Sequence, residues 1–271
     1  MNTGKKIRVV VTGAAGKMGQ AVMKGVFEDP DCSLVGAVDV TLIGTDVGKL
    51  IRSENIGVKI ERDLQQVLEE TQPDVMVDFT NAEAAFDNIM IALKSNVYPI
   101  VGTTGLAEKE MEEIQNFCEN TNIGAFFAPN FAIGAVLMMQ CAKIAARFLP
   151  DVEIIELHHD KKLDSPSGTA LRTAELIALE RNSYSKDTEQ KLIERLEGCR
   201  GGDLEGIHIH SVRLPGLVAH QEVVFGGLGQ TFSIRHDSIS RESFIPGVLL
   251  AIKEAPKRKG VIIGLENLMD I

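Results

Sequence analysis

The sequence of 271 residues contains no apolar run that approaches the length needed to span a bilayer, and its first residues lack the apolar core of a signal peptide. Cysteine is scarce, and the four cysteines at positions 32, 118, 141 and 199 include no C-x-x-C pair. We therefore expect neither a metal site nor a disulfide framework. Internal repeats and low-complexity tracts are also absent. These absences favour a cytoplasmic protein without a membrane partner.

Positively charged residues are also fewer than negatively charged ones. The formal net charge is −10, from 28 Lys and Arg against 38 Asp and Glu. A surface of this sign repels the phosphates of nucleic acids, so a nucleic-acid partner is not expected. Hydrophobic residues make up 44% of the chain and charged residues 24%, which is ordinary for a globular protein of one large or two smaller domains.

The N-terminal part has the pattern of a dinucleotide-binding unit. Residues 6–12 are a valine-rich run typical of a buried parallel strand, and the glycine turn Gly13-Ala-Ala-Gly-Lys-Met-Gly19 leads from it into helical spacing at residues 20–28. A second strand at 34–38 ends in Asp39, twenty residues past Gly19. In such units the helix start binds the pyrophosphate and the acid binds ribose hydroxyls, although here Ala15 stands at the usual second glycine.

Strand-helix alternation continues to residue 131, with strands expected at 73–79, 98–101 and 124–127 and helices at 81–94 and 108–119. Repeated units of this length predict a parallel sheet with helices on both faces. Ligands of such sheets lie at the carboxyl ends of the strands. Thr80 and residues 102–105 and 128–131 follow strand ends, so we expect them to face the nicotinamide end of a bound cofactor.

After Gly134 the pattern changes to a helix at 135–148, a strand at 151–157, a helix at 171–180 and antiparallel strands at 207–214, 218–225 and 230–236. The predicted fold is α/β, with a Rossmann-type parallel sheet domain and a second α+β domain whose sheet is mixed and largely antiparallel. We expect residues 1–130, completed by 240–271 with a helix at 240–254, to bind the dinucleotide. Residues 131–239 are expected to bind substrate and to cover one sheet face by self-association.

Reactive side chains are densest at residues 156–170, Glu-Leu-His-His-Asp-Lys-Lys-Leu-Asp-Ser-Pro-Ser-Gly-Thr-Ala. The small hydroxyl residues and the proline before the expected helix are helix-start signals. Backbone N–H groups at a helix start bind anions, so Gly168 and Thr169 are candidates for holding a carboxylate or phosphate. A histidine and a lysine nearby can donate protons or hold a second anionic group. Singly, these charges would indicate only a solvated loop; the cluster predicts a site.

These motifs, in this order, resemble the bacterial dihydrodipicolinate reductase family. Residues 156–170 are similar to its signature, and the likeness extends to the 13–19 turn, Val-Asp-Phe-Thr at 77–80, Gly-Thr-Thr-Gly at 102–105, Asn-Phe-x-x-Gly at 130–134, and the runs at 211–213 and 234–241. The resemblance implies reduction of a cyclic unsaturated dicarboxylate, 4-hydroxy-tetrahydrodipicolinate, to tetrahydrodipicolinate in the diaminopimelate route to lysine. It also implies hydride from NADH or NADPH, and a homotetramer.

The resemblance further implies a role for each candidate residue. His158 would be the catalytic proton donor or acceptor and Lys162 a catalytic proton donor. His159, Gly168 and Thr169 would hold the substrate. An extended backbone would point His158 and Lys162, which have the same parity, to one face and His159 elsewhere. The cofactor would be held by Gly13, Ala14, Ala15, Gly16, Lys17, Met18, Asp39, Gly102, Thr103, Thr104, Ala128, Pro129, Asn130 and Phe131.

The sequence predicts use of both cofactors. Asp39 suits the ribose hydroxyls of NADH and repels the 2′-phosphate of NADPH. Residues 40–42 bring no arginine, but Lys17 in the phosphate loop can reach toward a 2′-phosphate. These opposed effects at partly exposed sites leave neither cofactor strongly favoured.

Two other hypotheses use part of the same pattern. A sugar or semialdehyde dehydrogenase would share the first domain, but a semialdehyde enzyme that forms a thioester needs an activated cysteine beside a histidine, and no cysteine here has that setting. A non-catalytic redox sensor would bind a dinucleotide without needing the His-His-x-x-Lys cluster. Turnover of reduced nicotinamide separates an enzyme from a sensor.

Overall fold

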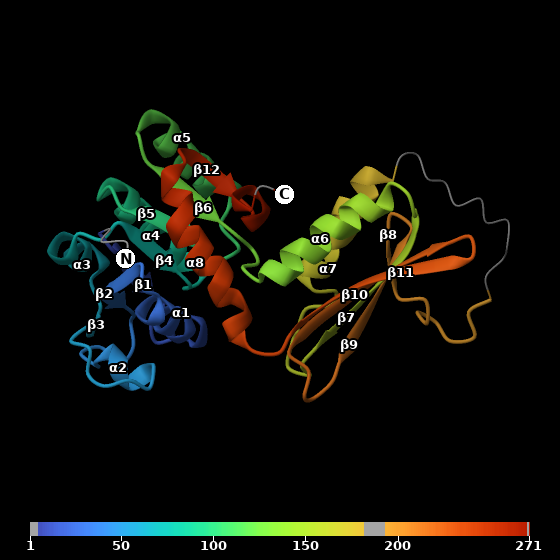
Figure 1. The fold of residues 1–271 in the computed structure, drawn as a ribbon, viewed down its shortest axis with the longest axis horizontal. Helices are drawn as coiled ribbons and strands as arrows, with labels where there is room; N and C mark the ends of the chain where they lie inside the picture. Colours follow the sequence, from blue (N-terminus) through green and yellow to red (C-terminus); the bar gives the residue numbers. More distant parts are fainter. Residues whose placement is uncertain (1–4, 182–192, 270) are drawn as a thin grey trace. The chain divides into compact units, whose positions relative to one another are not determined.

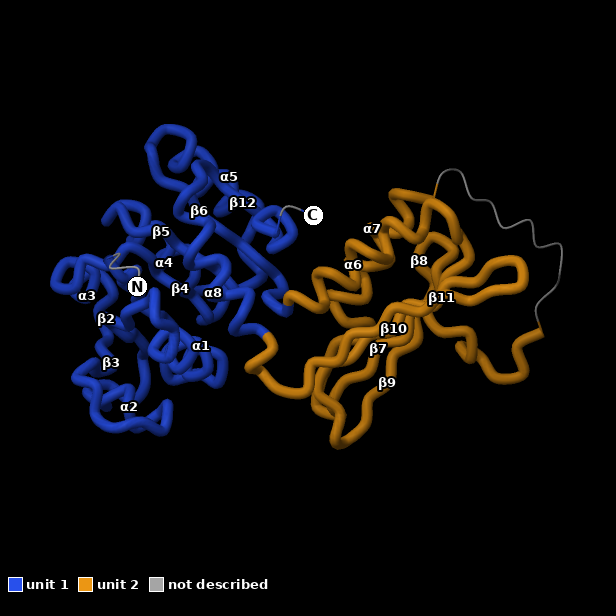
Figure 2. Tube along the Cα trace, viewed as in Figure 1, with its two compact units in different colours: residues 1–132, 244–271 blue, residues 133–243 orange. Residues whose placement is uncertain are grey.

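The computed structural model describes residues 5–181, 193–269 and 271. The chain divides into two compact units (Figure 2): unit 1 comprises Met1–Ala132 and Phe244–Ile271, and unit 2 comprises Ile133–Ser243. The assignment of dinucleotide and substrate to separate parts of the chain stays a prediction.

Unit 1 is built on a parallel sheet of seven strands in the order β12-β6-β5-β4-β1-β2-β3 (Figure 1). Every neighbouring pair is parallel, which confirms the predicted Rossmann-type sheet. The strands are β1 (Ile7–Thr12), β2 (Cys32–Val38), β3 (Ile60–Glu61), β4 (Val75–Asp78), β5 (Tyr98–Val101), β6 (Gly124–Phe127) and β12 (Gly260–Ile263).

Helices pack on this sheet in two groups, α1 (Lys17–Glu28) with α8 (Ile245–Glu254), and α3 (Leu64–Thr71) with α4 (Ala82–Lys94) and α5 (Glu108–Asn120). A short helix, α2 (Val47–Leu50), lies between β2 and β3. The strands are apolar because both faces are covered: Val9, Val10 and Val11 are each 0% exposed. The expected helix at 240–254 begins later, since a 3₁₀ turn (Arg241–Phe244) precedes α8 and a proline stands in its first turn.

Unit 2 contains a mixed sheet of five strands in the order β11-β10-β7-β9-β8, in which only β7 and β9 pair in parallel. The largely antiparallel second sheet is thus confirmed. Helices α6 (Ile133–Ala146) and α7 (Gly168–Glu180) pack together against it (Figure 1). The strands are β7 (Asp151–His158), β8 (Gly202–Leu204), β9 (Ile207–Arg213), β10 (Ala219–Gly227) and β11 (Gln230–Ser238).

Strand β7 carries the first candidate residues and has two unlike faces. Val152, Ile154 and Glu156 are buried, while Glu153 and Ile155 between them are partly exposed. The alternation places one row of side chains toward the core of unit 2 and the other on the open face of the sheet. No helix among the described residues is both long enough and apolar enough to cross a membrane.

Candidate active site

Glycine shapes the turn between β1 and α1. Gly13 has a φ of +72°, and a Cβ there would lie 2.3 Å from the carbonyl oxygen of Phe79. A Cβ on Gly19 would lie 2.1 Å from the carbonyl oxygen of Gly13. Gly16 is the N-cap of α1, and the Gln20 N–H donates to its carbonyl at 2.9 Å. The N–H groups ahead of Gln20 point out of the helix end, which is the arrangement that a pyrophosphate needs.

Asp39 follows β2, and its carboxylate is held at this turn. Oδ2 accepts the N–H of Ala15 at 2.9 Å, and Oδ1 accepts the N–H and the hydroxyl of Thr41 at 2.9 and 2.8 Å. The Ala15 N–H therefore orients the acid instead of facing a phosphate. A carboxylate has about four acceptor positions, so Asp39 can still accept ribose hydroxyls.

A pocket of about 430 Å³ opens beside Asp39, and Arg62 is part of its lining together with Gly13, Gly16 and Thr80. Sequence analysis missed Arg62. It comes directly after β3, and the Asp39 N–H donates to the carbonyl of Glu61 at 3.0 Å, which brings position 62 next to the acid. The side chain of Arg62 is exposed, and within the described part of the chain it forms no hydrogen bond or ion pair.

The ends of three strands are tied together by Asp78, a carboxylate that is 0% exposed. It accepts the hydroxyls of Thr12, Thr80 and Thr103 at 2.7, 2.8 and 2.6 Å, and the side-chain amide of Asn88 at 2.9 Å. Thr12 lies in β1 and Asn88 in α4, whereas Thr80 and Thr103 follow β4 and β5. The hydroxyl of Thr103, a predicted cofactor residue, is therefore engaged with Asp78. The sequence signal that could have pointed to Asp78 was the motif Val-Asp-Phe-Thr at 77–80.

The other predicted cofactor segments follow β5 and β6. Gly102 donates its N–H to the carbonyl of Asp78 at 2.9 Å, and Thr104 and Pro129 are exposed. Phe131 is 2% exposed, and its ring packs against Phe79 and Phe126.

In unit 2, a buried ion pair adjoins His158. Both carboxylate oxygens of Glu156 accept from the guanidinium of Arg213, Oε1 from Nη2 at 2.7 Å and Oε2 from Nη1 at 2.9 Å. Nδ1 of His158 hydrogen-bonds Oε2 of the same carboxylate. Burial would raise the pKa of Glu156, but the hydrogen bonds from Arg213, Ser211 and His158 outweigh it and hold that pKa below its usual range. Glu156 and Arg213 were not predicted as site residues, although both lie in segments that carried the family resemblance, residues 156–170 and 211–213.

The surroundings of His158 favour the uncharged form of its ring. Burial lowers the pKa of its ring most strongly, and the positive charges of Lys162 and Arg213 act in the same direction. The carboxylate of Glu156 opposes them without reversing the shift. A neutral imidazole can accept a proton and return it, as acid-base catalysis requires.

Lys162 lies near His158, but not for the reason predicted. Strand β7 ends at His158, and the Lys162 N–H donates to the carbonyl of His159 at 3.1 Å, so the chain turns here. The expectation of an extended backbone from 158 to 162 was wrong, because the chain forms a turn at these residues and the strand does not continue. The ammonium group of Lys162 is held by both oxygens of Asp164 at 2.7 and 2.8 Å, and the side chain of His159 is exposed.

The start of α7 has room for an anion. Ser167 caps the helix: its hydroxyl accepts the N–H of Ala170 at 3.2 Å, and its carbonyl accepts that of Leu171 at 3.0 Å. A Cβ on Gly168 would meet nothing within 4 Å, and its φ is not in the left-handed region. Neither strain nor packing requires a glycine there, so the open space is available to a ligand. Thr169 follows in the same turn.

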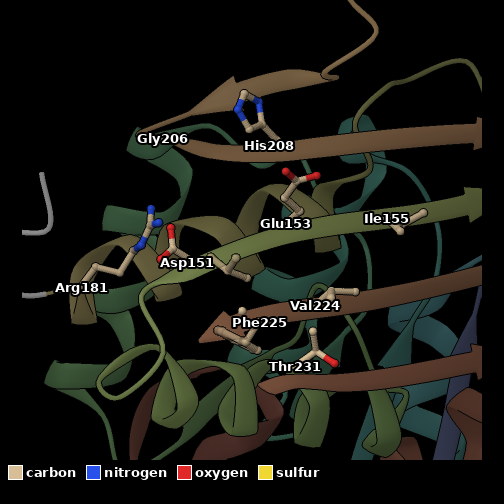
Figure 3. A pocket seen from close by; sticks show the side chains of 11 residues that line it. Asp151, Glu153, Ile155, Arg181, Gly206, His208, Val224, Phe225 and Thr231 are labelled. Carbon is tan, nitrogen blue, oxygen red and sulfur yellow. The ribbon is translucent and has the colours of Figure 1, made fainter. Parts of the chain in front are cut away.

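A second pocket, of about 320 Å³, lies on the open face of the unit 2 sheet (Figure 3). The side chains of Glu153 and His208 line this pocket from paired positions of β7 and β9. It contains none of the predicted site residues. The described residues also contain no group of three or more His, Cys, Asp or Glu side chains placed to hold a metal ion.

Two family models match the chain. That for the N-terminus of dihydrodipicolinate reductase matches residues 7–131, and that for its C-terminus matches residues 134–269. A 4-hydroxy-tetrahydrodipicolinate reductase of Desulfitobacterium hafniense (strain DSM 10664 / DCB-2) is 51% identical over 267 residues, covering 98% of this chain and 100% of the relative. The enzyme of the same name from Moorella thermoacetica is 51% identical over 264 residues, covering 97% and 98%.

Solved structures agree with these matches. A dipicolinate-bound dihydrodipicolinate reductase from Paenisporosarcina sp. TG-14 is 43% identical with a TM-score of 0.87, covering 97% of this chain and 99% of that one. A scyllo-inositol dehydrogenase from Lactobacillus casei, 12% identical with a TM-score of 0.61 over 98% and 92% of the two chains, shares the fold alone. With both family models matched across nearly the whole length, the chain belongs to the dihydrodipicolinate reductase family.

Proposed function

We propose that this chain reduces 4-hydroxy-tetrahydrodipicolinate to tetrahydrodipicolinate, as an NAD(P)H-dependent oxidoreductase of lysine and diaminopimelate biosynthesis. Relatives at about half identity over the full length carry this activity in their names. The structural observation that carries the proposal is the position of His158, whose ring lies within reach of the charge of Lys162 and in the same unit as the open helix start at Gly168.

The reaction takes up a hydride and a proton and releases the ring hydroxyl as water, so the site needs a proton donor. The charge of Lys162 lies close enough to His158 to lower the pKa of its ring. Lys162 is the proposed proton donor and His158 the proposed proton acceptor. Gly168 and Thr169 would hold one substrate carboxylate at the start of α7, where the helix dipole favours an anion. His159 would complement the remaining negative charge.

The cofactor supplies the hydride when bound, and residues 1–130 with 240–271 would bind it, while residues 131–239 would bind the substrate. The turn of residues 13–18 fits a pyrophosphate because Gly13 leaves no room for a side chain and α1 presents open N–H groups. Asp39 would bind the adenine ribose. Residues 102–104 and 128–131 remain the proposed contacts at the nicotinamide end.

Cofactor choice is expected to depend on Arg62. Its unpaired guanidinium lines the pocket beside Asp39, so it can bind a 2′-phosphate that the acid repels. Arg62→Ala should weaken NADPH binding about tenfold and NADH binding little, since an exposed charge-assisted bond is worth less than a buried one. Calorimetric titration of each variant with both cofactors measures this. Lys17→Ala is the comparison. A larger loss of NADPH affinity in Lys17→Ala than in Arg62→Ala would show that the phosphate loop, and not Arg62, binds the 2′-phosphate.

Gly168→Ala tests the substrate subsite. The added methyl meets no protein atom, so the free energy of unfolding should stay unchanged or rise by about 0.4–1 kcal/mol. The added methyl group lies where a substrate carboxylate would approach the helix start, so KM for the substrate should rise about tenfold. Thermal unfolding and steady-state kinetics give the two values. Gly202 has equally open surroundings, and Gly202→Ala should leave KM unchanged; equal KM values for wild type and Gly168→Ala would contradict the subsite.

We further propose a cytoplasmic homotetramer that assembles through the open face of the unit 2 sheet. Helices α6 and α7 pack on the other face, and the open face combines apolar and charged side chains. A second copy would cover it. Light scattering on the full chain should give four times the chain mass of 29.5 kDa; a monomer at micromolar concentration would contradict this. The residues of this face include Asp151, Glu153, Ile155, His208 and Val224.

A further inference from the structure

Glu156 is a residue that the packing of unit 2 does not require. Val152 and Ile154 precede it in the same buried row of β7, and Glu156 continues this row with 0% exposure. Taking a carboxylate out of water is costly, and buried ion pairs can often be replaced by apolar residues of similar volume without loss of stability. An apolar side chain would therefore serve the core at position 156. The acid needs another explanation.

The contacts of Glu156 supply one. Residues two apart on a strand share a face, so Glu156 and His158 lie side by side on β7. Arg213 fixes both carboxylate oxygens, at 2.7 and 2.9 Å, and also donates to the carbonyls of Asp164 and Val212 at 2.7 and 2.8 Å. The guanidinium thereby joins β9, the acid and the loop that carries Lys162. With both oxygens fixed, the carboxylate presents one of them to Nδ1 of His158.

We infer that Glu156 and Arg213 are positioning residues that hold His158 with its proton on Nδ1, so that Nε2 is the nitrogen offered to the substrate. A carboxylate only accepts hydrogen bonds, so the ring nitrogen that meets it carries the proton. Nε2 has no hydrogen-bond partner among the described residues. This rests on the proposed function, in which His158 accepts a proton. It adds which nitrogen does so, and what fixes it.

The charges around His158 set the expected pH dependence. Glu156 on β7 raises the pKa of the ring, whereas Arg213 on β9 and Lys162 in the turn lower it together with burial. Asp164 faces the ammonium of Lys162. Removing only the charge of Glu156 leaves every lowering influence in place, so the pKa of His158 falls further. The limb of the pH–rate profile that belongs to His158 should then move to lower pH.

Nitrogen-15 NMR of the histidine side chains tests the tautomer directly, with the His158 signals assigned from a His158→Gln variant. At neutral pH the wild-type ring should be protonated on Nδ1. In Glu156→Leu/Arg213→Met, which replaces the pair by apolar groups and should keep the fold, both tautomers should be populated. Its kcat should fall about tenfold with a smaller change in KM. Glu156→Gln keeps the shape and should shift the pH limb downward.

Strand β7 supplies its own control. Glu153, on the opposite face, contacts Arg200 and His210 in a trio of the same composition. Glu153→Gln should leave the His158 signals unchanged. A wild-type ring protonated on Nε2 would overturn the inference, and so would an unchanged tautomer and pH profile in both Glu156 variants. If His158→Gln instead turned over normally, the proposed role of His158 would fail, while the tautomer measurement would still decide the positioning.

Discussion

Replacement of His158 or Lys162 by alanine is expected to lower kcat by about 10² to 10⁴, the usual contribution of a positioned proton donor or acceptor. Both side chains belong to unit 2, and the glycine turn and Asp39 belong to unit 1. Affinity for the reduced cofactor should therefore stay near the wild-type value. Stopped-flow or steady-state turnover gives kcat, and calorimetry gives the cofactor affinity of the same preparations.

His159→Ala is the matched comparison for these variants. Its side chain is exposed just past the end of β7, and it is proposed to hold the substrate, so KM should change more than kcat. If His159→Ala were the slowest variant and His158→Ala nearly normal, the roles of the two histidines would be reversed. Loss of cofactor binding in Lys162→Ala would instead show that the effect is not confined to proton transfer.

Pyridine-2,6-dicarboxylate is expected to inhibit competitively against the substrate and to bind at least tenfold more tightly than pyridine-2-carboxylate. The second carboxylate adds a charge-assisted hydrogen bond, worth about 1.5–3 kcal/mol, which corresponds to a factor of roughly 10 to 150. One anion would lie at the start of α7 near Gly168, and the other near His159. The related Paenisporosarcina enzyme has been solved with dipicolinate bound.

Inhibition constants for the two acids, measured against varied substrate at constant pH and salt, decide this. Gly168→Ala provides an internal check. Crowding at the helix start should weaken binding of the diacid and so reduce the difference between the inhibition constants of the two acids. Equal inhibition by the mono- and diacid would refute the dicarboxylate site. It would also remove the main structural ground for preferring this substrate to a sugar or a semialdehyde.

Patterns of residues close together in the sequence predicted the main strands, turns and helix starts. The valine run of β1 and the glycines after it form one continuous pattern, and the structure shows that Gly13 and Gly19 admit no Cβ. Residues 156–170 were singled out as strand, turn and helix start for the same reason, since Ser167 and its neighbours carry the capping signal. Such features depend on residues close in sequence, and sequence patterns detect them.

Features that depend on distant pairing were not predicted. Arg62 lines the same pocket as Asp39 because it follows β3, a strand of only two residues with no periodicity of its own. Arg213 meets Glu156 because β9 pairs in parallel with β7 across more than fifty residues. Residues 240–271 were assigned to the first domain from the sequence, but the pairing of β12 with β6 was not predicted. In each case the partner is chosen by tertiary structure, which no local spacing records.

The most direct test of the account is a turnover assay with the full chain, 4-hydroxy-tetrahydrodipicolinate and NADH or NADPH, followed by the absorbance of the reduced nicotinamide. We expect the absorbance to fall only when chain, substrate and cofactor are all present, with both cofactors used, and with the rate lost in His158→Ala. Binding of the reduced cofactor without any substrate-dependent loss of absorbance would contradict the account and favour a dinucleotide sensor.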